Sequence, residues 1–117
     1  MKIIFTFILS VSYLFSVAQT KIPIDSVNSH KGQWVTVCGK VYGTKFLGKS
    51  QMTFIDLGAR YPNALLTIVI FEKARAYFPE SPETLYVDKQ ICVTGVIKEY
   101  KDKMQIVVDS PKEIVVE

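Results

Sequence analysis

The sequence contains few of the residues on which metal binding and nucleophilic catalysis depend. Among its 117 residues there is one histidine, His30, and the two cysteines do not form a short-spaced pair. A structural zinc site needs four Cys or His ligands, usually in such pairs. An activated nucleophile needs a base and an orienting acid within reach, and His30 has neither at a recognisable spacing. The sequence therefore predicts no metal site and no cofactor.

Arginine is also scarce, because Arg60 and Arg75 are the only two. A nuclease on a small β-barrel needs clustered carboxylates to hold a metal ion and arginines to stabilise the charge of the transition state. Asp56 and Asp109 stand alone in the sequence, without an obvious partner. We therefore predict that the chain is not an enzyme.

A strong charge of either sign is absent as well. There are 14 lysines and arginines against 11 acidic residues, a formal net charge of +3, and Lys2 lies in the apolar N-terminal segment. This balance is too mild to indicate a nucleic-acid partner on its own. Between residues 31 and 60, however, the only acidic residue is Asp56, against five basic ones: Lys31, Lys40, Lys45, Lys49 and Arg60. One side of the protein is predicted to be basic, either for a partner or as a solvated face.

The longest N-terminal apolar run, Ile3 to Phe15, is shorter than the roughly 20 residues that a membrane span requires. Lys2 precedes it, and Ser16 and Ala18 place small residues where signal peptidases cut. We predict a signal peptide over residues 1–18, cleaved after Ala18, and a single domain over residues 19–117. No cysteine follows the cut directly, so no stable membrane anchor is expected, and the protein is predicted to be periplasmic or secreted.

Two stretches with the same pattern organise the rest of the chain. Residues 33–42 and 89–97 both alternate apolar and polar side chains, as strands with one buried face do. The apolar rows are Val35, Val37 and Val41 in the first stretch and Ile91, Val93 and Ile97 in the second. Gly39 and Gly95 fall on these rows, where a missing side chain permits close backbone approach or a sharp bend. Such strands suit the corners of a small barrel.

The two cysteines, Cys38 and Cys92, occupy corresponding places in these strands and share the outward parity. If the strands are neighbours, a disulfide is possible, and closing a loop of about 55 residues would contribute roughly 4 kcal/mol in the chain-entropy model. The alternative is two small apolar groups without a bond. The sequence leaves both open.

Further strands are predicted at residues 52–57, 65–71 and 104–109, with an edge segment at 114–116. A short helix is expected over residues 72–78, ended by Pro79, with Pro82 preventing a restart. Tyr77 and Phe78 are expected to plug one end of the barrel. The order of elements predicts an all-β protein, a five-stranded OB-fold Greek-key barrel with a short helix between strands three and four.

Several segments resemble a known family: residues 35–41, 53–58, 61–63, 66–71, 93–98 and 105–108. They are similar to small secreted bacterial OB-fold proteins and to the OB module that accompanies some secreted nucleases. The resemblance implies a nucleic-acid-binding domain. The matching residues, including Gly39, Gly58 and Gly95, are barrel formers, so no catalytic residue carries over.

OB barrels usually bind ligands through their second and third strands and through the loops joining strands one to two and four to five. On this chain those surfaces offer nine aromatic or basic candidates: Lys45, Phe46, Lys49, Phe54, Arg60, Tyr61, Tyr100, Lys101 and Lys103. Single-stranded nucleic acid needs aromatic faces for its bases and cations for its phosphates. The alternative is that Phe54 and Tyr61 pack structurally and that the lysines keep a sheet edge soluble.

The predicted function is binding of single-stranded DNA, RNA or another polyanion, alone or beside a nuclease. The alternative is an interaction or stress-response module of the cell envelope with a protein or small-molecule ligand. The salt dependence of binding distinguishes them, because phosphate contacts weaken steeply as salt rises.

Overall fold

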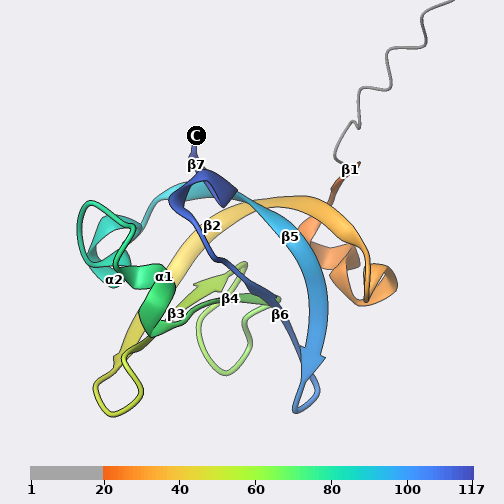
Figure 1. The fold of residues 1–117 in the computed structure, drawn as a ribbon. Helices are drawn as coiled ribbons and strands as arrows, with labels where there is room; N and C mark the ends of the chain where they lie inside the picture. The colour runs from red at the N-terminus through yellow and green to blue at the C-terminus, as the bar shows by residue number, and fades with distance from the viewer. Residues whose placement is uncertain (1–19) are drawn as a thin grey trace, which may run out of the picture.

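Seven strands form one sheet that curls into a barrel (Figure 1). The computed structural model describes residues 20–117, so the predicted signal peptide lies outside the described residues. The strands are β1 (Thr20–Ile22), β2 (Trp34–Leu47), β3 (Met52–Leu57), β4 (Leu66–Ile70), β5 (Gln90–Tyr100), β6 (Lys103–Val107) and β7 (Ile114–Val116). The helices are short: η1 (Ile24–His30), α1 (Glu72–Arg75), α2 (Pro82–Leu85) and η2 (Pro111–Glu113). Among the described residues, no helix has the length and apolar character to cross a membrane.

The sheet runs in the order β1-β2-β3-β4-β6-β5-β7, and β2 also pairs with β5. This second pairing closes a ring of β2, β3, β4, β6 and β5. Within the ring β4 and β6 are parallel and the other pairs are antiparallel. A five-stranded closed sheet with α1 and α2 between its third and fourth strands is an OB barrel, which confirms the predicted fold class.

The β2–β5 pairing confirms the predicted relation between the two repeated stretches. Cys38 lies directly opposite Cys92 on the outer face, and the two form a disulfide. Gly95 needs to be glycine, because a Cβ atom there would lie 2.5 Å from Ile106 Cγ2. Trp34, at the start of β2, lies opposite Val96 and is half exposed.

The inward rows of the five ring strands form one hydrophobic core. Branched side chains dominate it, as suits a pleated surface packed on one side. The fully buried members include Val35, Val37, Ile55, Ile68, Ile91 and Ile106. The core is therefore made from the alternating patterns that predicted the strands.

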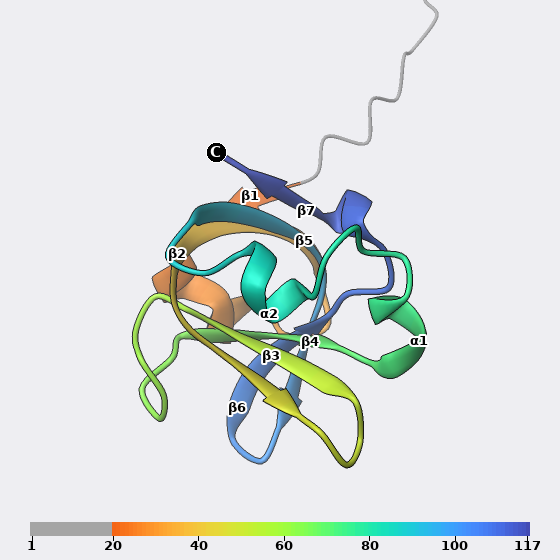
Figure 2. The same cartoon turned by 90° about the vertical axis from the view of Figure 1, so that its left-hand side faces the viewer.

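α1 and α2 cover one end of the barrel (Figure 2). Phe78 is buried there, and its ring meets Tyr86 edge to face with centroids 6.2 Å apart. The expected plug is therefore correct for Phe78 and wrong for Tyr77, which is 73% exposed. The expectation that Pro82 prevents another helix was also wrong, because proline is well suited to the first turn, where its missing N–H is not needed.

Residues 20–22 lie outside every strand predicted from the sequence. They form β1, which runs parallel to β2 with Ile22 opposite Val37. Three residues are too few to show an alternating pattern, so this strand could not be predicted.

A β-bulge in β2 determines which side chains of its second half reach the outer face. The pairing with β3 shifts between Val41 and Gly43, so one extra residue enters β2 and inverts the alternation that follows. Lys45 then shares the outer face with Phe54, whereas Phe46 shares the inward parity. Phe46 was expected in a loop and lies instead in β2, where the Arg75 guanidinium covers its ring at 4.1 Å from the centroid.

Candidate nucleic-acid interface

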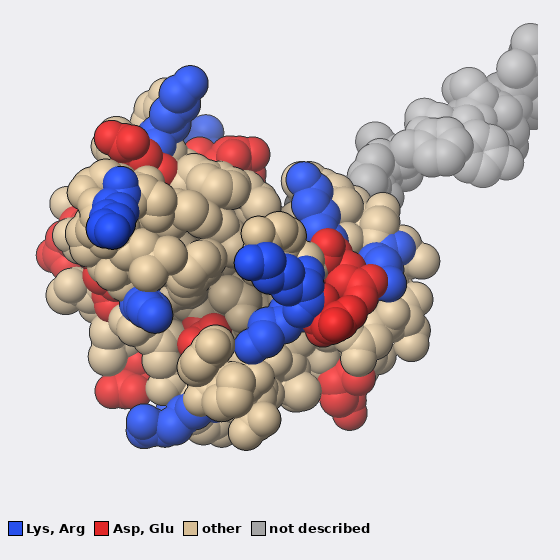
Figure 3. Space-filling view, turned by 90° about the horizontal axis from the view of Figure 1, so that it is seen from below, with Lys and Arg blue, Asp and Glu red and all other residues tan. Residues whose placement is uncertain are grey.

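Three loops extend from the same end of the barrel, at the bottom of Figure 1. They join β2 to β3 (residues 48–51), β3 to β4 (residues 58–65) and β5 to β6 (residues 101–102). The first and last are the loops through which OB barrels usually bind oligonucleotides. Figure 3 views this end and shows several basic side chains grouped near its centre beside a group of acidic ones, with single basic side chains around a surface of mostly uncharged atoms.

A polar row crosses the outer face of four strands above these loops. Gly43 lies opposite Asp56, Asp56 opposite Thr67, and Thr67 opposite Gln105. Residues directly opposite one another in a sheet share a face, so these four positions form a continuous line. Lys45 and Phe54 form the neighbouring pair.

A hollow of about 540 Å³ lies over this row. Its lining includes the aromatic rings of Tyr42, Phe54 and Tyr61, the basic side chains of Lys45, Arg60 and Lys103, and the polar groups of Asp56, Thr67 and Gln105. This combination of aromatic faces and cations is what single-stranded nucleic acid needs. We call these residues the outer-face hollow.

Five of the nine candidates from the sequence line the hollow: Lys45, Phe54, Arg60, Tyr61 and Lys103. They come from β2, β3, the β3–β4 loop and β6. Lys103 connects two of these elements, since its Nζ lies 4.5 Å from the Tyr61 ring centroid and donates to the carbonyl of Pro62 at 3.4 Å. One face of the Tyr61 ring thus carries a cation, while the side chain as a whole remains 75% exposed.

The other four candidates do not line the hollow. Phe46 packs beneath Arg75 at the helix-covered end. Lys49 lies exposed in the β2–β3 turn. Tyr100 and Lys101 stand at the β5–β6 turn, with Lys101 Nζ 5.3 Å from the Tyr100 ring centroid. They extend the basic and aromatic surface away from the hollow.

Asp56 is the residue of this site that sequence reasoning passed over as an isolated carboxylate. Its side chain is largely buried, and Thr67 Oγ1 donates a hydrogen bond to Oδ1 at 3.1 Å. Burial raises the pKa of Asp56 above its ordinary value, and the Thr67 hydrogen bond and the Lys103 charge oppose this change only in part. The shared parity of Phe54 and Asp56 was the signal that could have placed both on one face.

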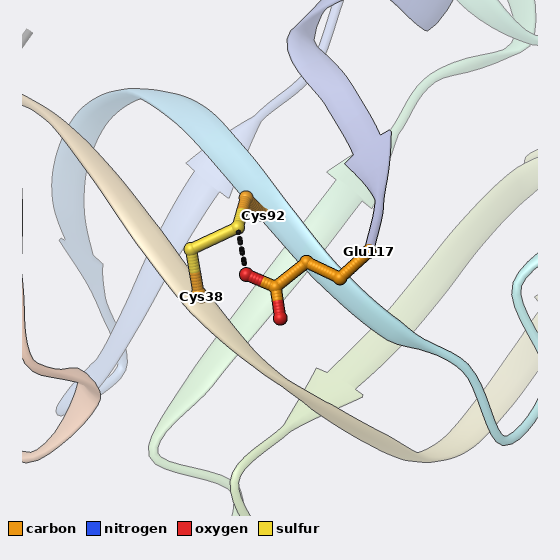
Figure 4. A group of neighbouring side chains, drawn as sticks. All are labelled: Cys38, Cys92 and Glu117. Atoms are coloured by element: carbon orange, nitrogen blue, oxygen red, sulfur yellow. Dashed lines mark hydrogen bonds between the residues drawn. A yellow bond between two sulfur atoms is a disulfide. The ribbon is translucent and has the colours of Figure 1, made fainter.

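The disulfide lies on another part of the outer surface, together with the Glu117 side chain (Figure 4). Glu117 Oε1 is 2.9 Å from Cys92 Sγ. Cys38, Cys92 and Glu117 are the only three metal-ligating side chains that lie within 4.8 Å of one another among residues 20–117. Because both sulfur atoms are used in the disulfide, the group offers only one carboxylate and is not a metal site as it stands.

The closed ring of five strands defines an OB-fold barrel, and its outer face has a hollow lined by aromatic and basic side chains. Residues 35–114 match the tRNA anticodon family, whose members are described as an OB-fold nucleic acid binding domain. The match covers more than half of the chain. The protein therefore belongs to this family of OB-fold nucleic acid binding domains.

Solved structures with the same fold include parts of two tRNA synthetases. Aspartyl-tRNA synthetase from Entamoeba histolytica aligns with a TM-score of 0.61 and 14% identity, over 92% of this chain and 23% of that one. Asparaginyl-tRNA synthetase from Pyrococcus horikoshii aligns with a TM-score of 0.56 and 17% identity, over 82% and 22%. This chain thus spans less than a quarter of the length of these enzymes.

A third similar structure is an OBody bound to hen egg-white lysozyme, with a TM-score of 0.53 and 14% identity. It covers 81% of this chain and 90% of the OBody. At these identities the likeness establishes the fold alone. The comparison with curated proteins found no match.

Proposed function

We propose that the protein is a non-enzymatic module that binds single-stranded nucleic acid on the outer face of β3, β4 and β6. The observation that supports this most directly is the outer-face hollow. Six aromatic or basic residues from four separate segments meet there, on the face and beside the loops that OB barrels use.

In the proposed complex, Phe54 and Tyr61 stack against bases, and Lys45, Arg60 and Lys103 neutralise phosphates. Stacking contributes about 1–3 kcal/mol per base, and every base has a face that can stack. The three cations define a short binding track. Tyr100, Lys101 and Lys49 would extend it toward the two neighbouring turns.

We further propose that the protein acts outside the cytoplasm, in the periplasm or beyond the cell. The predicted signal peptide and the Cys38–Cys92 disulfide support this location, because disulfides persist in oxidising compartments. A secreted nuclease or an envelope protein is a possible partner in such a setting.

Fluorescence anisotropy of labelled single-stranded RNA and DNA, measured with the purified protein, tests the proposed function. Three phosphate contacts predict that log K falls against log salt with a slope of about −2. Tyr61→Ala should weaken binding at least about fivefold. Tyr77→Ala is the matched control, since Tyr77 is 73% exposed but lies beyond α1 and outside the hollow.

Replacing Lys45 and Lys103 together by alanine should flatten the salt slope to about −1. Lys73 and Lys112, which are exposed and lie outside the hollow, provide the charge-matched control pair. No binding at low salt would refute the proposal. Binding without salt dependence would refute the phosphate contacts assigned to Lys45, Arg60 and Lys103.

A further inference from the structure

The negative charge of Asp56 is unfavourable on a surface that binds only phosphates. Its carboxylate lines the hollow among Lys45, Arg60 and Lys103. A negative charge there repels phosphate and cancels part of the attraction of the cations. It can favour a nucleic-acid ligand by accepting hydrogen bonds from a ribose hydroxyl or, with both carboxylate oxygens, from neighbouring N–H groups of a base.

The surroundings of Asp56 hold its carboxylate in place and leave part of it uncovered. Thr67 donates to Oδ1 from β4, which fixes the rotation of the group. On the β2 side, directly opposite, stands Gly43. A Cβ atom at Gly43 would lie 3.9 Å from Asp56 Oδ2, so any longer side chain would extend over the carboxylate.

Hydrogen-bond donors lie beside this acceptor. Lys103 and Gln105, both on β6, line the same hollow, and Lys103 is close enough for its charge to act on Asp56. The ring of Phe54, on the same face of β3, supplies an apolar surface. The hollow therefore presents an acceptor carboxylate, adjacent donors and an aromatic face.

Among the four bases, guanine has the complementary edge. Its N1–H and N2–H groups are neighbouring donors that fit two carboxylate oxygens, and its O6 is an acceptor next to them. Adenine and cytosine each place a lone pair beside their single amino donor, and uracil has one N–H between two carbonyl groups. These lone pairs would face the carboxylate and be repelled.

We infer that the hollow is a guanine-selective subsite, in which Asp56 accepts from N1–H and N2–H while Lys103 or Gln105 donates to O6. This inference rests on the proposed function. It extends that function by naming which base the hollow selects and which residue selects it.

The stability of the fold supplies independent support. Burial raises the pKa of Asp56, so keeping this carboxylate charged at neutral pH costs folding free energy. Asparagine would keep the Thr67 hydrogen bond without that cost. A buried titratable group with a shifted pKa that lines a ligand-sized hollow is typical of a functional site.

The test compares four eight-nucleotide RNAs that are uridine throughout except for one central guanosine, inosine, adenosine or uridine. A single guanosine per strand avoids quadruplexes. The guanosine RNA should bind about tenfold more tightly than the adenosine and uridine RNAs, the discrimination typical of a bidentate contact. Inosine keeps N1–H and O6 but lacks the 2-amino group, so its affinity should be intermediate.

Asp56→Asn should reduce the guanosine preference to less than about twofold, and the all-uridine RNA should bind slightly more tightly because a charge that repels phosphate is removed. Asp109→Asn removes an exposed carboxylate outside the hollow and should change neither. Gly43→Val should also suppress the preference, because it covers the carboxylate without changing charge. This variant keeps the test decisive if Asp56→Asn does not fold.

The outcomes separate the two levels of inference. Equal affinity for all four RNAs would overturn the guanine subsite and leave the proposed function standing. Guanosine preference that survives in both variants would overturn the role of Asp56. If none of the RNAs binds at low salt, the proposed function fails and the subsite with it.

Discussion

Replacing Gly95 by alanine should destabilise the barrel by overpacking, without touching the ligand face. The added Cβ would lie 2.5 Å from Ile106 Cγ2, whereas real Cβ contacts do not come below 3.0 Å. Ile106 is fully buried and Gly95 is buried and paired with Val35 of β2, so neither can move freely. Overpacking of this kind costs about 1–3 kcal/mol. For a domain of this size that lowers Tm by roughly 5–20 °C.

The clash is with one methyl group, and a second substitution can remove it. Ile106→Leu has no branch at Cβ and alone should cost less than about 1.5 kcal/mol. The double variant should therefore be less destabilised than the sum of the two single variants, by at least about 1 kcal/mol. Urea unfolding followed by far-ultraviolet circular dichroism measures all three values.

Gly48→Ala is the control, because a Cβ at Gly48 meets nothing within 4 Å. It should change the unfolding free energy by no more than about 0.5 kcal/mol. If Gly95→Ala changes the unfolding free energy no more than the control does, the close approach of β5 and β6 is not the reason for a glycine at position 95. The same conclusion follows if the free-energy changes of Gly95→Ala and Ile106→Leu simply add in the double variant.

Three further predictions concern the disulfide, the covered end and the buried acid. Replacing Cys38 and Cys92 together by serine should lower the unfolding free energy by about 4 kcal/mol in urea, and a loss below 1 kcal/mol would contradict the chain-entropy argument. Glu83→Ala should cost about 1–3 kcal/mol, because Arg75 Nη2 donates to Glu83 Oε1 at 2.8 Å and both side chains are mostly buried. Asp56→Asn should raise Tm at pH 7, and this advantage should shrink as the pH falls through the raised folded-state pKa and be lost below 3.8, where the wild-type acid becomes neutral in both states; a constant difference across that range would refute the assignment.

Much of the barrel was predictable because its inward rows are regular. Val35, Val37 and Val41 carry a clear period of two, and the parity of Cys38 and Cys92 is what places their sulfur atoms on one face. The bulge before Gly43 could not be located in this way. Gly43 indicates a bend in the strand, but the pattern does not show that an extra residue enters there and inverts every later side chain of β2.

The candidate site was therefore predicted in part. Lys45 and Phe54 come together because both lie on regular stretches facing outward, after the bulge has set the register of β2. Phe46 was assigned to the wrong environment for the same reason. The role of Asp56 could not be predicted, because its neighbours Thr67 and Gln105 are far from it in the sequence. They lie on the same row as Asp56 only because β3 pairs with β4 and β4 pairs with β6.

The position of Trp34 in the fold determines which structural changes its fluorescence can detect. It is the only tryptophan in the sequence, and it stands at the β2–β5 seam opposite Val96, outside the lining of the hollow. Intrinsic tryptophan fluorescence should therefore follow opening of this seam during unfolding and change little when a ligand occupies the hollow, which lies on another part of the outer surface. The tyrosines Tyr42 and Tyr61 line the hollow, so ligand binding should be visible in tyrosine emission instead. In one sample, tryptophan fluorescence should thus follow unfolding and tyrosine fluorescence should follow ligand binding.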